Sequence, residues 1–231
     1  MASAVETIAS RMVEICKLRE LSLEGTQVVQ VPDLPWLTDL DLSETPFSDL
    51  AQLGNLGELE ELDLSGTRVV NLDKLVQFHR LHTLELDGLS LESLAVIRKF
   101  KLKFLGLYQA SIRNWEGFGQ LPELETLVLG RSNFPGFSES MGMPALEEIS
   151  LRGCTLDALS NVSQFTSLKR LDLKNAKIKD ISALAECKSL VYLNLEDANV
   201  EESQVRALQA ALPNLKIVRD LADEIPIHWR R

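Results

Sequence analysis

The stretch LKRLDLKNAKIKDISALAECKS, residues 168–189, decides the fold of this chain. Its apolar residues follow neither the 3.6-residue period of an amphipathic helix nor the strict alternation of one long strand. At its start Leu171 and Leu173 alternate with charged residues, which is typical of a short strand with one apolar face. Further apolar residues follow at wider intervals: Ile178, Ile181, Leu184 and Cys187. The mixed period therefore predicts a strand, then turns or short 3₁₀ helices that bring apolar side chains back to the same core.

The same pattern recurs along almost the whole chain. Each repeat opens on a leucine and reads LxxLxL or a close variant, as in LEELDL (59–64) and LETLVL (124–129), and the last, LKIVRDL, is degraded. One such repeat cannot bury its apolar face alone, so the repeats must stack and their strands must form a parallel sheet. The opening residues, most often 22 apart, are Leu18, Leu37, Leu59, Leu81, Leu102, Leu124, Leu146, Leu168, Leu190 and Leu215.

These repeats resemble those of the leucine-rich repeat family, in particular the 22-residue class of internalins and protein-phosphatase regulatory subunits. The motif LDLKNAKIKDIS, within residues 168–189, is the most similar to that class. The resemblance covers residues 18–218. It implies an α/β fold: a curved, horseshoe-shaped solenoid with one parallel sheet on its concave face and turns and short 3₁₀ helices on its convex face.

The ninth position of each repeat departs from the family pattern. Many leucine-rich repeats have an asparagine there, which ties neighbouring turns together, whereas this chain has Thr, Ser, Leu, Ala or Cys. Hydroxyl groups can replace part of that ladder, but Leu89 and Ala110 must rely on packing. We therefore expect irregular loops around residues 89 and 110.

We expect a single leucine-rich repeat domain over residues 1–231. Apolar residues at helical spacing in 3–17 predict an amphipathic helix that caps the first repeat, so residues 1–17 are assigned to an N-terminal cap. Near the other end, Ser203 is a plausible N-cap for a helix over QVRALQAALP. Residues 219–231 form a tail whose Ile227 and Trp229 either fold onto the last repeat, which we favour, or serve as a docking peptide.

Charge and cysteine content limit the classes of partner and compartment. The net charge is −10, which argues against nucleic acid or an anionic membrane as the main partner and permits a basic protein. The three cysteines, Cys16, Cys154 and Cys187, lie in apolar patterns and suggest no disulfide framework. With no secretory signal and no apolar run of transmembrane length, the sequence favours a cytoplasmic protein.

No arrangement of residues indicates an enzyme. The sequence contains no zinc-binding, nucleophile-elbow or phosphate-loop motif, and we expect His79 and His82 to be solvent-exposed. We therefore expect no catalytic residue, no cofactor and no metal site. Calcium is disfavoured because the acidic side chains would lie on a flat sheet rather than in a looping cage.

Strand alternation turns the third, fifth and seventh residues of each repeat outward, onto the concave face. This face is acidic in the first four repeats, aromatic at the centre, and partly basic beyond. Simple solvation explains the acidic part as well as binding does, and a neighbouring side chain or a second copy of the chain would equally cover the aromatic part. The predicted partner-binding residues are Asp39, Asp41, Glu61, Asp63, Glu85, Asp87, Phe104, Tyr108, Val128, Arg131, Arg152, Arg170, Lys174 and Tyr192.

The favoured hypothesis is a non-enzymatic module that binds one protein through the concave face and is monomeric when free. Phe104 and Tyr108 would be central anchors, and the carboxylates would steer a basic patch of the partner. Such a module would be an inhibitor or immunity-type protein, an adaptor or a regulatory subunit. The alternatives are the substrate-recognition part of a ubiquitin ligase or phosphatase assembly, and a structural homo-oligomer that buries the aromatic patch.

Overall fold

The computed structural model describes residues 17–139 and 141–219. The chain divides into two compact units, one ending at Leu121 and the other beginning at Pro122. The predicted N-terminal cap helix lies outside the described residues except for Lys17, as do Ile227 and Trp229 of the tail. A single domain over the whole chain stays a prediction.

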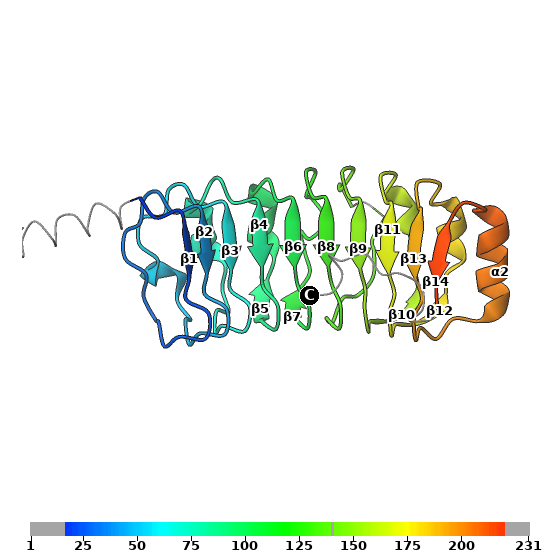
Figure 1. Cartoon of the computed structure of the whole chain (residues 1–231), viewed down its shortest axis with the longest axis horizontal. Helices are drawn as coiled ribbons and strands as arrows, with labels where there is room; N and C mark the ends of the chain where they lie inside the picture. Colours follow the sequence, from blue (N-terminus) through cyan, green and yellow to red (C-terminus); the bar gives the residue numbers. More distant parts are fainter. Residues whose placement is uncertain (1–16, 140, 220–231) are drawn as a thin grey trace, which may run out of the picture. The chain divides into compact units, whose positions relative to one another are not determined.

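The first unit contains a parallel sheet whose strands lie side by side (Figure 1). Each strand pairs with the next position for position, so that Leu21 is opposite Leu40 and Leu40 is opposite Leu62. In sheet order the strands are β1 (Glu20–Ser22), β2 (Asp39–Asp41), β3 (Glu61–Asp63), β4 (Thr83–Glu85) and β6 (Phe104–Gly106).

The core of this unit is built from the leucines that define the repeat. The opening residues Leu37, Leu59, Leu81 and Leu102 are at most 1% exposed, and the middle residues of β2, β3, β4 and β6 are equally buried or nearly so. Because side chains alternate along a strand, burial of the middle residue turns the residues on either side of it outward. The predicted register of the repeats is confirmed.

The chain returns on the opposite side of the unit through 3₁₀ helices, as predicted. These are η1 (Leu50–Gln52), η2 (Asp73–Gln77) and η3 (Ala95–Lys99). A second, small sheet pairs β5 (Ser90–Ser93) with β7 (Ser111–Asn114), and Figure 1 shows these strands beyond the ends of β4 and β6.

The prediction of irregular loops around residues 89 and 110 is wrong. Leu89 and Ala110 are each 1% exposed, and each directly precedes a strand of the small sheet. Neither side chain carries a polar group that competes for backbone hydrogen bonds, so the chain stays extended and the Ser111 amide donates to the Leu89 carbonyl at 2.8 Å.

The second unit has the same construction. The residues Ile178, Ile181, Leu184 and Cys187, predicted from the opening stretch to fill the core, are at most 3% exposed. The strands of its main sheet are β8 (Thr126–Val128), β9 (Glu148–Ser150), β11 (Arg170–Asp172), β13 (Tyr192–Asn194) and β14 (Lys216–Val218). The other elements are β10 (Thr155–Ala158), paired with β12 (Lys177–Asp180), and η4 (Val162–Gln164), η5 (Ser182–Glu186) and α2 (Glu202–Ala211).

The α2 helix begins earlier than predicted. Its N-cap is Glu201, and Ser203 lies in the first turn. The Ser203 hydroxyl donates to the Glu201 carboxylate at 3.3 Å and therefore caps no backbone amide. The Glu201 carbonyl accepts from the Gln204 and Val205 amides, which starts the helix at that point.

Two turn positions recur after the sheet strands. The eighth residue of each of the first nine repeats has a positive φ, between 54° and 73°. The ninth-position hydroxyls of Thr26, Thr45, Thr67 and Ser132 donate to the carbonyl three residues earlier, so they stabilise turns within one repeat and do not link neighbouring repeats. The eighth-position residues are Gly25, Glu44, Gly66, Gly88, Gln109, Arg131, Gly153, Asn175 and Asp197.

Candidate functional site

Two rows of outward side chains cross the main sheet of the first unit. We name each row after its position in the repeat. The residues at the third position form the third row: Glu20, Asp39, Glu61, Thr83 and Phe104. The fifth row is Ser22, Asp41, Asp63, Glu85 and Gly106. Both rows line an open hollow of about 270 Å³ over β1 to β4, which we call the acidic hollow.

The fifth-row carboxylates have a structural role. Asp41 Oδ1 accepts a hydrogen bond from the Ser43 amide at 2.9 Å, and Asp63 Oδ1 accepts one from the Ser65 amide at 2.7 Å. In the second unit Asp172 and Asn194 accept from the amide two residues later in the same way. The turn that follows each strand explains why a carboxylate or amide stands at the fifth position.

No third-row carboxylate stabilises a turn in this way, although Asp39 accepts a hydrogen bond from the Thr38 hydroxyl. Glu20 and Glu61 are exposed, and no hydrogen bond or ion pair joins the carboxylate of either to another described residue. Asp39 lies opposite both of them, and strands are spaced about 4.8 Å apart. Like charges directly opposite each other are destabilising, so this row costs stability and the fold does not explain it.

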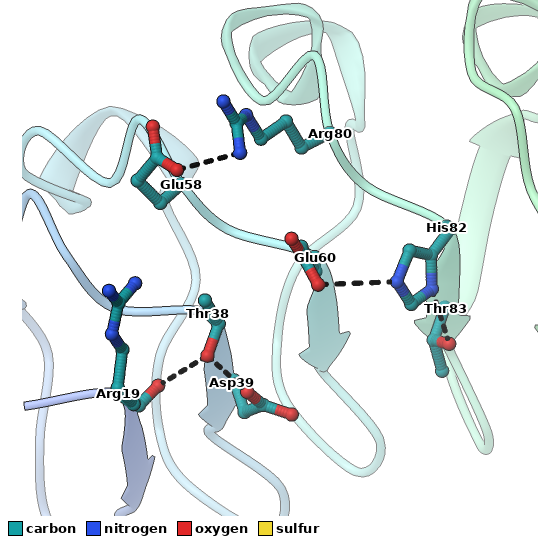
Figure 2. Close-up of polar contacts among 8 residues, drawn as sticks. All are labelled: Arg19, Thr38, Asp39, Glu58, Glu60, Arg80, His82 and Thr83. Atoms are coloured by element: carbon teal, nitrogen blue, oxygen red, sulfur yellow. Dashed lines mark hydrogen bonds and ion pairs between the residues drawn. The ribbon is translucent and has the colours of Figure 1, made fainter.

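Arg19, Arg80 and His82 lie at the edge where the strands begin, and their contacts are with groups other than the carboxylates of the hollow (Figure 2). Arg80 Nη1 lies 2.7 Å from Glu58, and His82 Nε2 lies 3.6 Å from Glu60. Arg19 donates to the Trp36 carbonyl and stands over the Trp36 ring. His82 is half-buried, whereas we predicted it to be exposed; His79 is exposed as predicted.

Burial, hydrogen bonds and neighbouring charges together shift the pKa values of three carboxylates on this surface. Burial raises the pKa of Asp63, and the charges of Asp41 and Glu44 raise it further, against hydrogen bonds from Ser65. Burial raises the pKa of Asp87 to about 6. The hydrogen bond from the Tyr108 amide lowers this pKa, and the charge of Asp63 raises it further. Burial also acts on Asp41, but hydrogen bonds from Ser43 and Ser22 outweigh it and its pKa is lowered.

The turn hydrogen bonds change their pattern at the centre of the first unit. Gly106 has no side chain to accept from the amide two residues later, and Asp87 Oδ1 from the neighbouring repeat accepts from the Tyr108 amide at 2.7 Å instead. The Asp87 amide in turn donates to Ser65 Oγ at 3.2 Å. A Cβ on Gly106 would lie 3.1 Å from Asp87 Oδ1 and 3.4 Å from Phe104 Cε1, so glycine leaves the room that both side chains use.

The predicted basic part of the surface, in the second unit, is a set of ion pairs within the chain. Arg152 Nε lies 3.4 Å from Asp172, Arg170 Nε lies 3.1 Å from Glu148, and Lys174 Nζ lies 2.8 Å from Glu196. The carboxylates of Asp172 and Glu196 are 1% and 4% exposed. Arg152 and Lys174 therefore neutralise buried carboxylates of the same unit, and Arg170 neutralises the half-buried Glu148.

The remaining predicted residues differ in exposure. Phe104, Tyr108 and Val128 are half-buried, Arg131 is exposed, and Tyr192 is buried with Arg170 4.8 Å over its ring. Sequence reasoning selected neither Ser65 nor Gly106, although both shape the surface around Asp87. The one signal was glycine at a fifth position where the three preceding repeats have an acid.

Metal binding and membrane insertion find no structural support. Among residues 17–139 and 141–219, no group of three or more His, Cys, Asp or Glu side chains is placed to hold a metal ion. In the same part of the chain, no helix has the length and apolarity needed to cross a bilayer.

Solved structures similar to this chain are built from leucine-rich repeats. The internalin InlF of Listeria monocytogenes is 20% identical, with a TM-score of 0.74 over 90% of this chain and 68% of its own. The chain has the leucine-rich repeat fold. Internalin C2 of the same bacterium is 23% identical, with a TM-score of 0.57 over 87% of this chain and 80% of its own.

A third similar structure of this fold is a mouse protein. A chain of the RP105/MD-1 complex is 23% identical, with a TM-score of 0.68 over 88% of this chain and 42% of its own. No protein-family model matches the sequence, and no curated protein matches it either. At these identities the similarity establishes the fold of this leucine-rich repeat chain and leaves its partner to be argued from the surface.

Proposed function

We propose that this leucine-rich repeat chain is a protein-binding module whose first unit contacts a basic region of one partner. The observation that carries the proposal is the pair of exposed third-row carboxylates, Glu20 and Glu61, which no other described residue neutralises. A row of like charges that the fold does not use is costly for the free protein, and a cationic partner removes that cost.

The shape of the surface favours a macromolecule over a small metabolite. The acidic hollow is open and lies on a sheet, whereas small-molecule sites enclose most of the ligand in a concave, mostly apolar pocket. Repeat proteins of this kind use their extended sheet surface for binding. The RP105/MD-1 structure is itself a complex of this fold, which supports a protein as the class of partner.

Aromatic residues adjoin the acidic hollow. Phe104 lies opposite Thr83, at the end of the third row, and Tyr108 follows on the same repeat. Both are half-buried, and such side chains are typical energetic anchors of protein interfaces. We propose Phe104 and Tyr108 as anchors, with Asp39, Asp41, Glu61, Asp63, Glu85 and Asp87 providing attraction and orientation.

The second unit has a smaller part in this proposal. To reach Arg152, Arg170 or Lys174, a carboxylate of the bound protein would have to displace an internal one. Leaving the buried Asp172 or Glu196 without its cation would be costly. Val128, Arg131 and Tyr192 complete the proposed surface on this unit. The proposed module is monomeric, cytoplasmic and non-enzymatic, and its partner's identity would separate an inhibitor or immunity-type role from that of an adaptor or regulatory subunit.

The test is quantitative affinity capture from a lysate of the source organism. The double variant Glu20→Lys, Glu61→Lys is compared with wild type and with the control Asp73→Lys, Glu116→Lys. The control changes the net charge by the same amount at exposed residues of the first unit that lie outside the two rows.

We expect wild type and control to retain the same partner and the row variant to lose it, with all three equally folded by circular dichroism. Retention by the row variant equal to that by wild type would contradict the proposal. A captured ligase or phosphatase catalytic subunit would assign the chain to substrate recognition in that assembly.

A further inference from the structure

The second unit contains an arginine held between a carboxylate and an aromatic ring. Glu148, Arg170 and Tyr192 occupy the third position of adjacent strands, β9, β11 and β13, and lie directly opposite one another. Arg170 Nε is 3.1 Å from the Glu148 carboxylate, and its guanidinium carbon is 4.8 Å from the centre of the Tyr192 ring. Such an arrangement combines ion pairing with a cation–π contact.

The first unit repeats this arrangement without the arginine. Glu61, Thr83 and Phe104 occupy the third position of the adjacent strands β3, β4 and β6, and they also lie directly opposite one another. The carboxylate and the aromatic ring are thus separated by one strand, as in the second unit. Among the described residues, no Lys or Arg stands over the Phe104 ring.

The space over Thr83 fits a guanidinium. Neighbouring strands are about 4.8 Å apart, so Glu61 and Phe104 are about 10 Å apart, the same span that Arg170 bridges. Thr83 is short, and its hydroxyl lies 3.1 Å from His82 Nδ1, towards the strand-start edge (Figure 2). The Phe104 ring and Asp87 both lie close to Gly106, where a Cβ would be 3.4 Å from Phe104 Cε1 and 3.1 Å from Asp87 Oδ1.

We propose that an arginine side chain of the protein partner docks over Thr83, between the Glu61 carboxylate and the Phe104 ring. This inference rests on the proposed function and names the group that the first unit recognises. Arginine is favoured over lysine because its flat, weakly hydrated guanidinium stacks on a ring and pairs with a carboxylate at once. An apolar side chain there would desolvate Glu61, Glu85 and Asp87 without compensating their charge.

The probes are two short blocked peptides with identical lysine and glycine residues around one central position, which is arginine in one peptide and citrulline in the other. Citrulline keeps the shape and loses the charge. Binding is measured by isothermal titration at low ionic strength to full-length wild type, Thr83→Arg, Thr83→Gln and Phe104→Leu. We expect wild type and Thr83→Gln to prefer the arginine peptide about 10-fold.

We expect Thr83→Arg and Phe104→Leu to lose this preference, because the first fills the space with its own guanidinium and the second removes the ring. Thr83→Arg should also melt at a higher temperature than Thr83→Gln, a readout that needs no ligand. Trp36→Leu, which removes an exposed ring that already has Arg19 over it, is the matched control and should keep the preference.

Equal affinity of wild type for the two peptides, including absence of binding to both, would overturn the docking position. So would a preference that survives Thr83→Arg and Phe104→Leu. If the preference is absent while Glu20→Lys, Glu61→Lys still abolishes partner capture, the acidic surface stands and only the arginine position fails. If partner capture is insensitive to the row variant, the proposed function itself fails.

Discussion

The Asp87 carboxylate accepts a hydrogen bond from the Tyr108 amide of the next repeat, at 2.7 Å, and so replaces the acceptor that Gly106 lacks. In β2 and β3 the equivalent acceptors, Asp41 and Asp63, serve the turn of their own repeat. Burial of Asp87 raises its pKa to about 6, against the hydrogen bond from the Tyr108 amide, and the missing Cβ of Gly106 leaves the room that Asp87 and Phe104 occupy. One glycine thus links turn stability, titration and surface shape at the centre of the first unit.

Removal of the Asp87 acceptor is expected to destabilise the fold. Asp87→Ala leaves the partly buried Tyr108 amide without its partner and should lower the free energy of unfolding by about 1–3 kcal/mol. Asp87→Asn keeps an acceptor oxygen and should cost less. Urea unfolding of both variants measures the difference; an equal cost for the two would show that the hydrogen bond is not the stabilising feature.

Acidification should stabilise the protein through Asp87. Its folded pKa of about 6 is above the ordinary value of 3.8, so the folded state binds the proton more tightly than the unfolded state. The stabilising contribution is complete below the ordinary value and is lost as the pH rises through about 6. The free energy of unfolding of wild type should therefore rise from about pH 7 to about pH 5. Asp87→Asn should show a smaller rise, and identical slopes would contradict this assignment.

We predict that Glu44, at the eighth position of its repeat, destabilises the folded state. It has a φ of 55°, in a region that glycine adopts without penalty and that other residues avoid. Glu44→Gly should raise the free energy of unfolding by about 1 kcal/mol. Glu44→Ala, which removes the carboxylate and its repulsion of Asp63 but keeps the strained backbone, is the control, and Glu44→Gly should exceed it in thermal or urea unfolding by the cost of the strain.

Two ion pairs of the second unit should differ in their contribution to the free energy of unfolding because they differ in burial. Arg152→Met removes the ion-pair partner of the Asp172 carboxylate, which is 1% exposed and keeps its hydrogen bond from the Lys174 amide, and should cost about 1–3 kcal/mol. Lys179→Met breaks a shorter contact, 2.6 Å to Asp157, but both side chains are more than 80% exposed and we expect no measurable change. Urea unfolding of the two variants would contradict this reasoning if the costs were equal.

Much of the fold was predictable because its signal is local. The leucines at the start of each repeat define both the strand and its inward face, so Glu61 and Asp63 were correctly placed on the outward side of Leu62. The strands around residues 89 and 110 were not predicted, since pairing of β5 with β7 depends on contact between two repeats rather than on either segment alone.

The sequence by itself determined the repeat, its register and the rows of outward residues, because a two-residue alternation within a repeat and a 22-residue spacing between repeats leave one way to bury the leucines. Only the tertiary structure decided which charged side chains are paired within the chain and which are left to bind a partner. Arg152, Arg170 and Lys174 face carboxylates of neighbouring strands, whereas Glu20 and Glu61 face no cation among the described residues. The physical reason is that ion pairing across strands depends on which repeats become neighbours and how their side chains turn, a relation that no single repeat contains.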